Sequence, residues 1–138
     1  MQITWLAPTL LYVLAIAGLG ITVKLAMRDM PWHDILPWIA LSYAIISVVL
    51  VATGATKLHV GAGTPWAIAT AICGATGLIA LFVALEHGKV TTVVPVSAAY
   101  PIVSAIFAVI VLSEQVTAAK VAGILLVVVG VIMVTLSP

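Results

Sequence analysis

The chain consists of long apolar runs separated by short polar or glycine-rich stretches. Each run is about 19 to 23 residues long, and about 20 apolar residues in a helix suffice to cross a hydrocarbon layer of about 30 Å. The runs are continuous and do not alternate apolar with polar positions, which excludes the strands of a membrane β-barrel. The pattern therefore predicts five membrane-spanning helices, over residues 4–25, 35–53, 65–85, 90–112 and 117–136.

Turn-forming and polar residues mark the boundaries of these runs. They occupy Met27 to Asp34, Gly54 to Thr64, Glu86 to Lys89 and Ser113 to Gln115. Pro37 and Pro65 are predicted in first helical turns, where a missing N–H does no harm, and Thr117 is expected to cap the last helix. Tryptophans are expected to anchor the span ends at the membrane interface: Trp5, Trp32, Trp38 and Trp66.

Composition places the chain in the membrane. Of its 138 residues 64% are hydrophobic and 7% are charged, whereas soluble domains carry about 25% charged residues. The net charge of +1 provides no basic patch for nucleic acid. A single cysteine, Cys73, excludes an internal disulfide and a multi-cysteine metal site. We expect a multi-pass protein of a cell membrane, such as a bacterial or archaeal inner membrane.

Basic residues are divided almost evenly between the two sides of the predicted topology. The first and third loops carry Lys24, Arg28 and Lys89, and the second and fourth carry Lys57 and Lys120. Under the positive-inside rule, the small excess either places the N-terminus outside or lets the chain insert in both orientations. In the second case the chain would pair with an inverted copy of itself.

The residues from Ala84 to Ser137 resemble the EamA domain of the drug/metabolite transporter superfamily. The similarity lies in a span ending in Ala-Leu, a helix with a Pro…Tyr-Pro pair, a turn with glutamate and a glycine-rich last helix. The matching residues are Ala84, Leu85, Pro95, Tyr100, Pro101, Glu114, Gly123 and Gly130. The first span, with Gly18, Gly20 and Lys24, is similar to the start of that domain.

This resemblance implies one EamA-type transmembrane domain over residues 1–138 that transports small metabolites or drugs. Larger relatives carry two five-helix repeats, so we expect this single repeat to form a dimer, either with itself or with a paralogue. The alternative is an accessory membrane subunit, such as half of a flippase for a lipid-linked substrate. A small-molecule substrate and the lipid bilayer are the expected partners, and no cofactor is expected.

The predicted helix over residues 90–112 carries the candidate transport site. Pro95 and Pro101 each remove a backbone donor and free a carbonyl, which predicts kinks that can bend during gating. Ser97, Tyr100 and Ser104 are spaced three and four apart, on one helical face. This face is expected to line a cavity and bind substrate. The alternative is that the hydroxyls cap freed carbonyls and hold helices together.

Two further polar positions are candidates for substrate binding. Lys24 either faces the pathway and binds an anionic group or extends its stem to the membrane interface. Tyr43 and Ser47 lie four residues apart, and either line the cavity or hydrogen-bond a neighbouring helix.

Small residues form two predicted packing faces. Gly123 and Gly130 lie two turns apart on one face of the last helix. They suit either intrachain packing or a dimer seam like that of the small multidrug resistance transporters. Thr70, Gly74 and Gly77 form a similar face, for which packing is expected.

Chemistry of other kinds has little support in the sequence. No acidic residue lies inside a predicted span, which disfavours proton-coupled antiport of cationic drugs. His33, His59 and His87 fall in three separate loops, so no three-histidine site is expected. Glu86, His87 and Glu114 are expected to serve as solvated turn residues. With no catalytic pair or phosphate loop, we expect a transporter rather than an enzyme.

Overall fold

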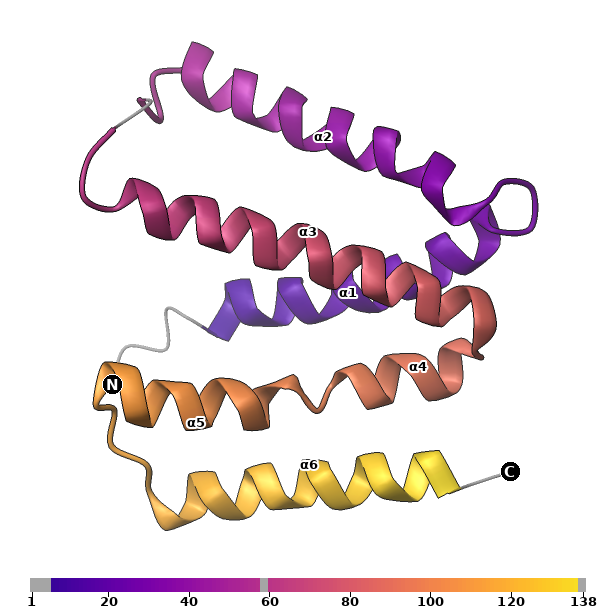
Figure 1. Ribbon diagram of the computed structural model, residues 1–138, viewed down its shortest axis with the longest axis vertical. Helices are drawn as coiled ribbons and strands as arrows, with labels where there is room; N and C mark the ends of the chain where they lie inside the picture. Colours follow the sequence, from indigo (N-terminus) through magenta and orange to yellow (C-terminus); the bar gives the residue numbers. More distant parts are fainter. Residues whose placement is uncertain (1–5, 58–59, 137–138) are drawn as a thin grey trace. The chain divides into compact units, whose positions relative to one another are not determined.

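The computed structural model describes residues 6–57 and 60–136, which are helical with short turns and contain no strand. The helices are α1 (Leu6–Ala26), α2 (Trp32–Ala52), α3 (Thr64–His87), α4 (Val90–Ser97), α5 (Tyr100–Leu112) and α6 (Ala118–Leu136) (Figure 1). Within this described part, five rods are long and apolar enough to cross a membrane, and α4 with α5 forms one of them, Val90–Leu112. The predicted all-α class with five spans is confirmed.

Some sequence-based expectations fall on residues outside the described part of the chain. These are the start of the first span at Thr4, the tryptophan Trp5, the histidine His59, and Ser137 at the end of the family resemblance.

The chain divides into two compact units, Met1–His87 and Gly88–Pro138. In the first unit α1, α2 and α3 contact one another, and α2 runs opposite to α1 and α3 (Figure 1). The ends of α1 and α3 therefore lie at the same end of this unit as the start of α2. The four most buried apolar side chains of the described residues belong to this end of the unit: Val23, Ile35, Phe82 and Leu85.

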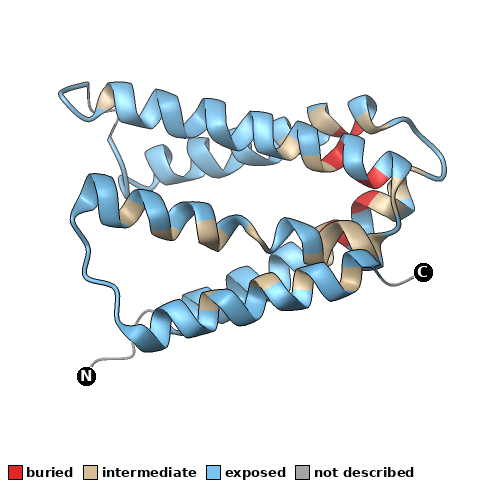
Figure 2. Ribbon diagram, turned by 60° about the horizontal axis from the view of Figure 1, so that its bottom comes forward, coloured by how far each residue is buried: buried red, intermediate tan, exposed pale blue. Residues whose placement is uncertain are grey.

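In the second unit α4 and α5 run in one direction and α6 returns in the other, with α4 packed against α6 (Figure 1). No residue of α4, α5 or α6 is buried, and most of the ribbon is exposed (Figure 2). Apolar side chains on such open faces are stable only against hydrocarbon or another protein surface, because exposing them to water is unfavourable. The burial pattern therefore agrees with a membrane environment.

The start of α2 differs from the prediction. Pro31 adopts an extended conformation, with φ −68° and ψ 154°, and the helix begins at Trp32, three residues earlier than expected. Pro37 consequently lies in the second helical turn and not in the first. Its missing N–H leaves the carbonyl of His33 without its usual helical donor.

The end of α3 also differs. The helix continues to His87, so Glu86 and His87 belong to its last turn, and only Gly88 and Lys89 separate α3 from α4. His33 likewise lies in the first turn of α2, so the expectation that His33 and His87 occupy loops is wrong. The expectation failed because charged side chains occur at helix ends as well as in turns.

The connection from α5 to α6 contains both a cap and a strained residue. The Lys120 amide donates to Oγ1 of Thr117 at 3.4 Å, which confirms Thr117 as the cap of α6. Ser113 ends α5 in the left-handed region, with φ 54°. This conformation lets the backbone turn, at a steric cost that a residue with a Cβ has to bear.

Candidate functional site

The fourth span is interrupted between α4 and α5, at Ala98 and Ala99. Pro101 is the second residue of α5, and it has no N–H to donate to the carbonyl of Ser97, four residues before it. Its ring also crowds that carbonyl, so a continuous helix is disfavoured one turn before the proline. Pro95, by contrast, lies inside α4.

Short-range hydrogen bonds satisfy most of the backbone at this break. The Ala98 amide donates to the carbonyls of Val94 at 3.2 Å and Pro95 at 3.1 Å, and the Ala99 amide donates to that of Val96 at 3.1 Å. Bonds to the third residue back wind the chain more tightly than an α-helix. The break is therefore a defined turn in which most amides keep a partner.

The three candidate hydroxyl residues are divided by the break. Ser97 ends α4, whereas Tyr100 and Ser104 lie four residues apart on one face of α5. The Ser97 hydroxyl donates to the Val94 carbonyl at 2.7 Å. It therefore does not cap the carbonyls that the prolines free, which belong to Thr91 and Ser97. Tyr100 is 58% exposed.

Lys24 turns toward a neighbouring helix. It lies in the last turn of α1, is half-buried, and its Nζ donates to the backbone carbonyl of Leu85 near the end of α3. The last carbonyls of a helix lack intrahelical donors, and they attract a positive charge. Lys24 thus connects the ends of α1 and α3 electrostatically.

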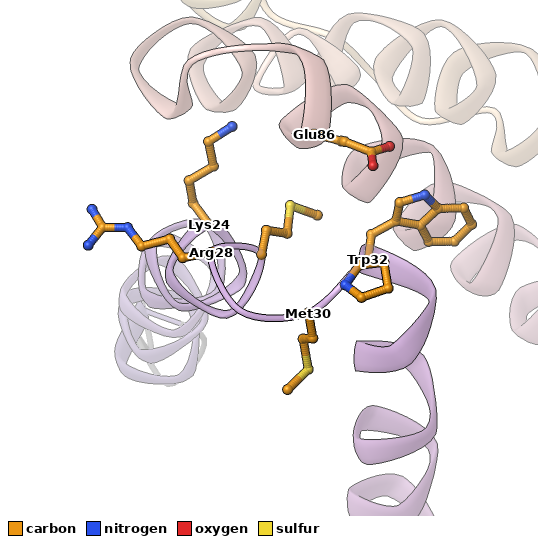
Figure 3. A pocket seen from close by; sticks show the side chains of 7 residues that line it. Lys24, Arg28, Met30, Trp32 and Glu86 are labelled. Atoms are coloured by element: carbon orange, nitrogen blue, oxygen red, sulfur yellow. The ribbon is translucent and has the colours of Figure 1, made fainter.

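Beside Lys24 lies a cavity of about 250 Å³. We call it the α1–α3 end cavity, and its lining residues are Lys24, Met27, Arg28, Met30, Pro31, Trp32 and Glu86. In Figure 3 the Lys24 side chain extends toward α3, the Glu86 carboxylate lies on the side of Trp32, and the Arg28 guanidinium extends away from both. The site therefore combines two cations, one carboxylate and one aromatic ring.

Sequence reasoning did not identify this cavity as a site. Glu86 was expected in a turn and Trp32 as an interfacial anchor, and only Lys24 was a binding candidate. One signal was available, since helices that alternate in direction bring the first and third loops to the same side. The sequence does not reveal that the Lys24 side chain reaches a backbone carbonyl of α3.

Tyr43 and Ser47 lie on α2, apart from the α1–α3 end cavity. The Ser47 hydroxyl donates to the Tyr43 carbonyl at 2.8 Å, and the Tyr43 side chain is 64% exposed. The hydroxyl of Ser47 is therefore satisfied within its own helix and does not join α2 to a neighbouring helix.

The glycine faces have open surroundings. A Cβ added at Gly123 or Gly130 would meet no heavy atom within 4 Å, and the same holds for Gly74 and Gly77. The described part of the chain therefore makes no close backbone approach at these four glycines.

The polar side chains at the helix ends form two local pairs. His33 Nε2 lies 3.6 Å from Asp34 Oδ1, and His87 Nδ1 lies 3.9 Å from Glu86 Oε2. Within residues 6–57 and 60–136, no group of three or more His, Cys, Asp or Glu side chains is placed to hold a metal ion.

A second cavity in the described residues is an apolar groove of about 350 Å³ between α5 and α6. Its lining residues are Ile102, Ala105, Ile106, Val109, Ile110, Val116, Val121, Ile124 and Leu125. The groove begins one residue after Pro101 and offers only dispersion contacts, which suits a hydrocarbon chain.

Comparison with known proteins gives one match. The sequence model of the EamA-like transporter family matches residues 3–136 of the chain. No curated protein and no solved structure matches it.

Proposed function

We propose a transport mechanism for this chain, which belongs to the EamA-like transporter family. The family is one of membrane transporters, and residues 6–57 and 60–136 contain five helices suited to span a membrane. We propose that it acts as one five-helix repeat that moves a small metabolite or drug through a cavity lined by α4 and α5. Two such repeats, one inverted relative to the other, would form the working dimer.

The observation that carries this proposal is the depth of the α4–α5 break. Ala98 and Ala99 follow Val90, the start of the span, by eight and nine residues. At 1.5 Å per residue this is a rise of about 12 to 14 Å, which is nearly half of a hydrocarbon layer of about 30 Å. Irregular backbone at such depth is stable only inside protein or beside a water-filled cavity. The break therefore supports a polar cavity at the middle of the membrane.

The side chains around the break supply groups that a polar solute can use. Tyr100 and Ser104 share a face of α5, and the Ser97 carbonyl lacks the donor that Pro101 cannot provide. Because no Asp or Glu occurs in this span, we propose that a neutral or amphiphilic solute is recognised by hydrogen bonds and not by an embedded carboxylate.

The inverted dimer draws its support from charge and from α6. Three basic residues against two give the chain almost no orientation bias. Gly123 and Gly130 leave a face of α6 that a second helix can approach closely, because a Cβ added at either glycine would meet no heavy atom of another element within 4 Å.

The test uses purified protein in two steps. A thermal-shift screen against amino acids, sugars and lipid headgroups identifies a solute that stabilises the folded state. Uptake of that solute into proteoliposomes is then compared for the wild type, Tyr100→Phe and Tyr100→Ala. Loss of one hydrogen bond to the solute should reduce uptake by about fivefold.

Tyr12→Phe on α1 is the matched control and should transport normally. Normal uptake by both Tyr100 variants, at equal protein in the vesicles, would remove Tyr100 from the site. Absence of uptake for every solute that stabilises the wild type would contradict the transport proposal itself.

The groove between α5 and α6 favours a second candidate, a subunit of a flippase for a lipid-linked substrate. An alkyl chain in this groove would place a polar headgroup beside the α4–α5 break. Scrambling of a fluorescent lipid-linked sugar in proteoliposomes, blocked by Ala105→Trp, would support this candidate over transport of a soluble solute.

A further inference from the structure

We propose that the α1–α3 end cavity binds a zwitterionic headgroup that carries a phosphate and a primary ammonium. Lys24 and Arg28 would hold the phosphate, and Glu86 with Trp32 would hold the ammonium. This inference goes beyond the proposed transport function, because it concerns residues of the first unit and needs no movement of solute.

The positive wall of the cavity comes from two cations. Lys24 and Arg28 both line it, and Lys24, with three donors, can keep its bond to the Leu85 carbonyl and still reach a phosphate oxygen. The Arg28 guanidinium extends away from Lys24 in Figure 3; once turned toward the cavity, it can make two parallel hydrogen bonds to phosphate oxygens.

The negative wall lies on α3. Glu86 is exposed and is the one carboxylate among the lining residues. No salt bridge joins Glu86 to Arg28 in the described part of the chain, so the two side chains do not neutralise each other. The carboxylate lies on the side of Trp32 (Figure 3), and an ammonium between them would gain an ion pair and a cation–π contact.

The size and position of the cavity limit the ligand. Drug-sized ligands occupy about 300 to 1,000 Å³, so a cavity of about 250 Å³ suits a smaller group. The five residues between α1 and α2 lie where two spans end, at the level where lipid headgroups begin. Met27 and Met30 add apolar contacts for the glycerol part of a lipid.

An ethanolamine phospholipid and free phosphoethanolamine offer the same pair of charges. The experiment distinguishes them by native mass spectrometry of the full-length protein, with phosphatidylethanolamine and phosphatidylglycerol of identical acyl chains added in equal amounts. The wild type should retain phosphatidylethanolamine by about fivefold to tenfold over phosphatidylglycerol, as expected for one additional charged hydrogen bond.

Three variants test the roles of the side chains. Glu86→Gln should abolish the preference for phosphatidylethanolamine over phosphatidylglycerol, while some of each lipid is still retained. Arg28→Gln should weaken the binding of both lipids by about tenfold. Lys57→Gln, beyond the other end of α2, is the matched control and should behave as the wild type. Tyr100→Phe should also keep the preference, so loss of transport and loss of lipid binding are separate results.

Equal retention of the two lipids by the wild type, or an unchanged preference in Glu86→Gln, would overturn the proposal. Added phosphoethanolamine provides the second arm. If it displaces the lipid, the cavity accepts the free headgroup as well; if it does not, the cavity requires the lipid, and both results keep the assigned chemistry.

Discussion

Individual hydroxyl side chains in the spans are satisfied by their own helices. Thr22 donates to the Gly18 carbonyl at 2.9 Å, Thr70 to that of Trp66 at 2.9 Å, and Thr135 to that of Val131 at 2.8 Å. In hydrocarbon an unpaired hydroxyl costs several kcal/mol, and a bond to the carbonyl four residues back avoids that cost. The sequence marks these threonines as polar positions inside apolar helices, but it does not show which acceptor each hydroxyl would choose.

Lys24 is expected to stabilise the first unit. The Lys24→Gln substitution removes the ammonium group that donates to the Leu85 carbonyl. This part-buried carbonyl near the end of α3 then has no positively charged donor. The free energy of unfolding should fall by about 1 to 3 kcal/mol, measured by thermal or denaturant unfolding in detergent. Lys57→Gln, at an exposed position, should change it by less than about 0.5 kcal/mol. Equal stability of the two variants would contradict the assigned role.

Two residues in the left-handed region should respond to substitution in opposite directions. Gly54 has φ +71° with open space around it, so Gly54→Ala adds backbone strain and should destabilise by about 1 kcal/mol. Ser113 has φ 54°, so Ser113→Gly relieves strain and should stabilise by about 0.5 to 1 kcal/mol. Thermal unfolding of both variants against the wild type checks the signs, and shifts in the same direction would contradict the backbone strain assigned to these two positions.

At the scale of the elements, the existence of the spans was predictable and their ends were less so. Apolar length alone predicts each rod, because only helices satisfy their backbone within the hydrocarbon. The ends depend on local geometry, such as the extended Pro31 that allows α2 to begin at Trp32. The extension of α3 to His87 likewise rests on hydrogen bonds that composition does not reveal.

The α4–α5 break should depend on Pro101. Pro101→Ala restores an amide that can donate to the Ser97 carbonyl, so α4 and α5 should join into one helix. Hydrogen exchange of the amides from Ala98 to Tyr100 should then slow by about tenfold or more, because exchange reports local opening.

Pro95→Ala is the matched control, since Pro95 lies within α4 and not at the break. It should leave exchange at Ala98 and Ala99 close to that of the wild type. A break that persists in Pro101→Ala would show that other residues cause it.

At the scale of the whole molecule, the number of spans and the membrane environment followed from the sequence, whereas the partners of each face did not. Lipid-facing and protein-facing side chains are both apolar, so hydrophobicity does not separate them. The hydrogen bond from Lys24 to the Leu85 carbonyl could not be predicted from the sequence either. Every residue has a backbone carbonyl, so the sequence does not indicate which one accepts. The residues of the α1–α3 end cavity come together only in the folded chain, and for this reason the sequence does not reveal them as one site.

Topology should respond to a single charge. Two reporters can be fused at Pro138, one active only on the inner side of the membrane and one active only on the outer side. If the chain inserts in both orientations, both fusions should give signal. Lys89→Gln changes the balance of basic residues from three against two to two against two, and should shift the ratio of the two signals toward equality. Activity on one side only, unchanged by Lys89→Gln, would exclude the inverted homodimer.

If Ser97 contacts a solute, as the sequence predicts, its bond to the Val94 carbonyl has a consequence for selectivity. The Ser97 hydroxyl already donates its proton to the Val94 carbonyl. A solute oxygen that accepts a hydrogen bond from Ser97 must therefore replace the Val94 carbonyl as the acceptor. Only solutes whose oxygen competes with a peptide carbonyl gain from the exchange, and weak acceptors such as ethers would pass unrecognised. The affinity of the protein for different solutes would then follow the hydrogen-bond acceptor strength of the solute oxygen more than the size of the solute.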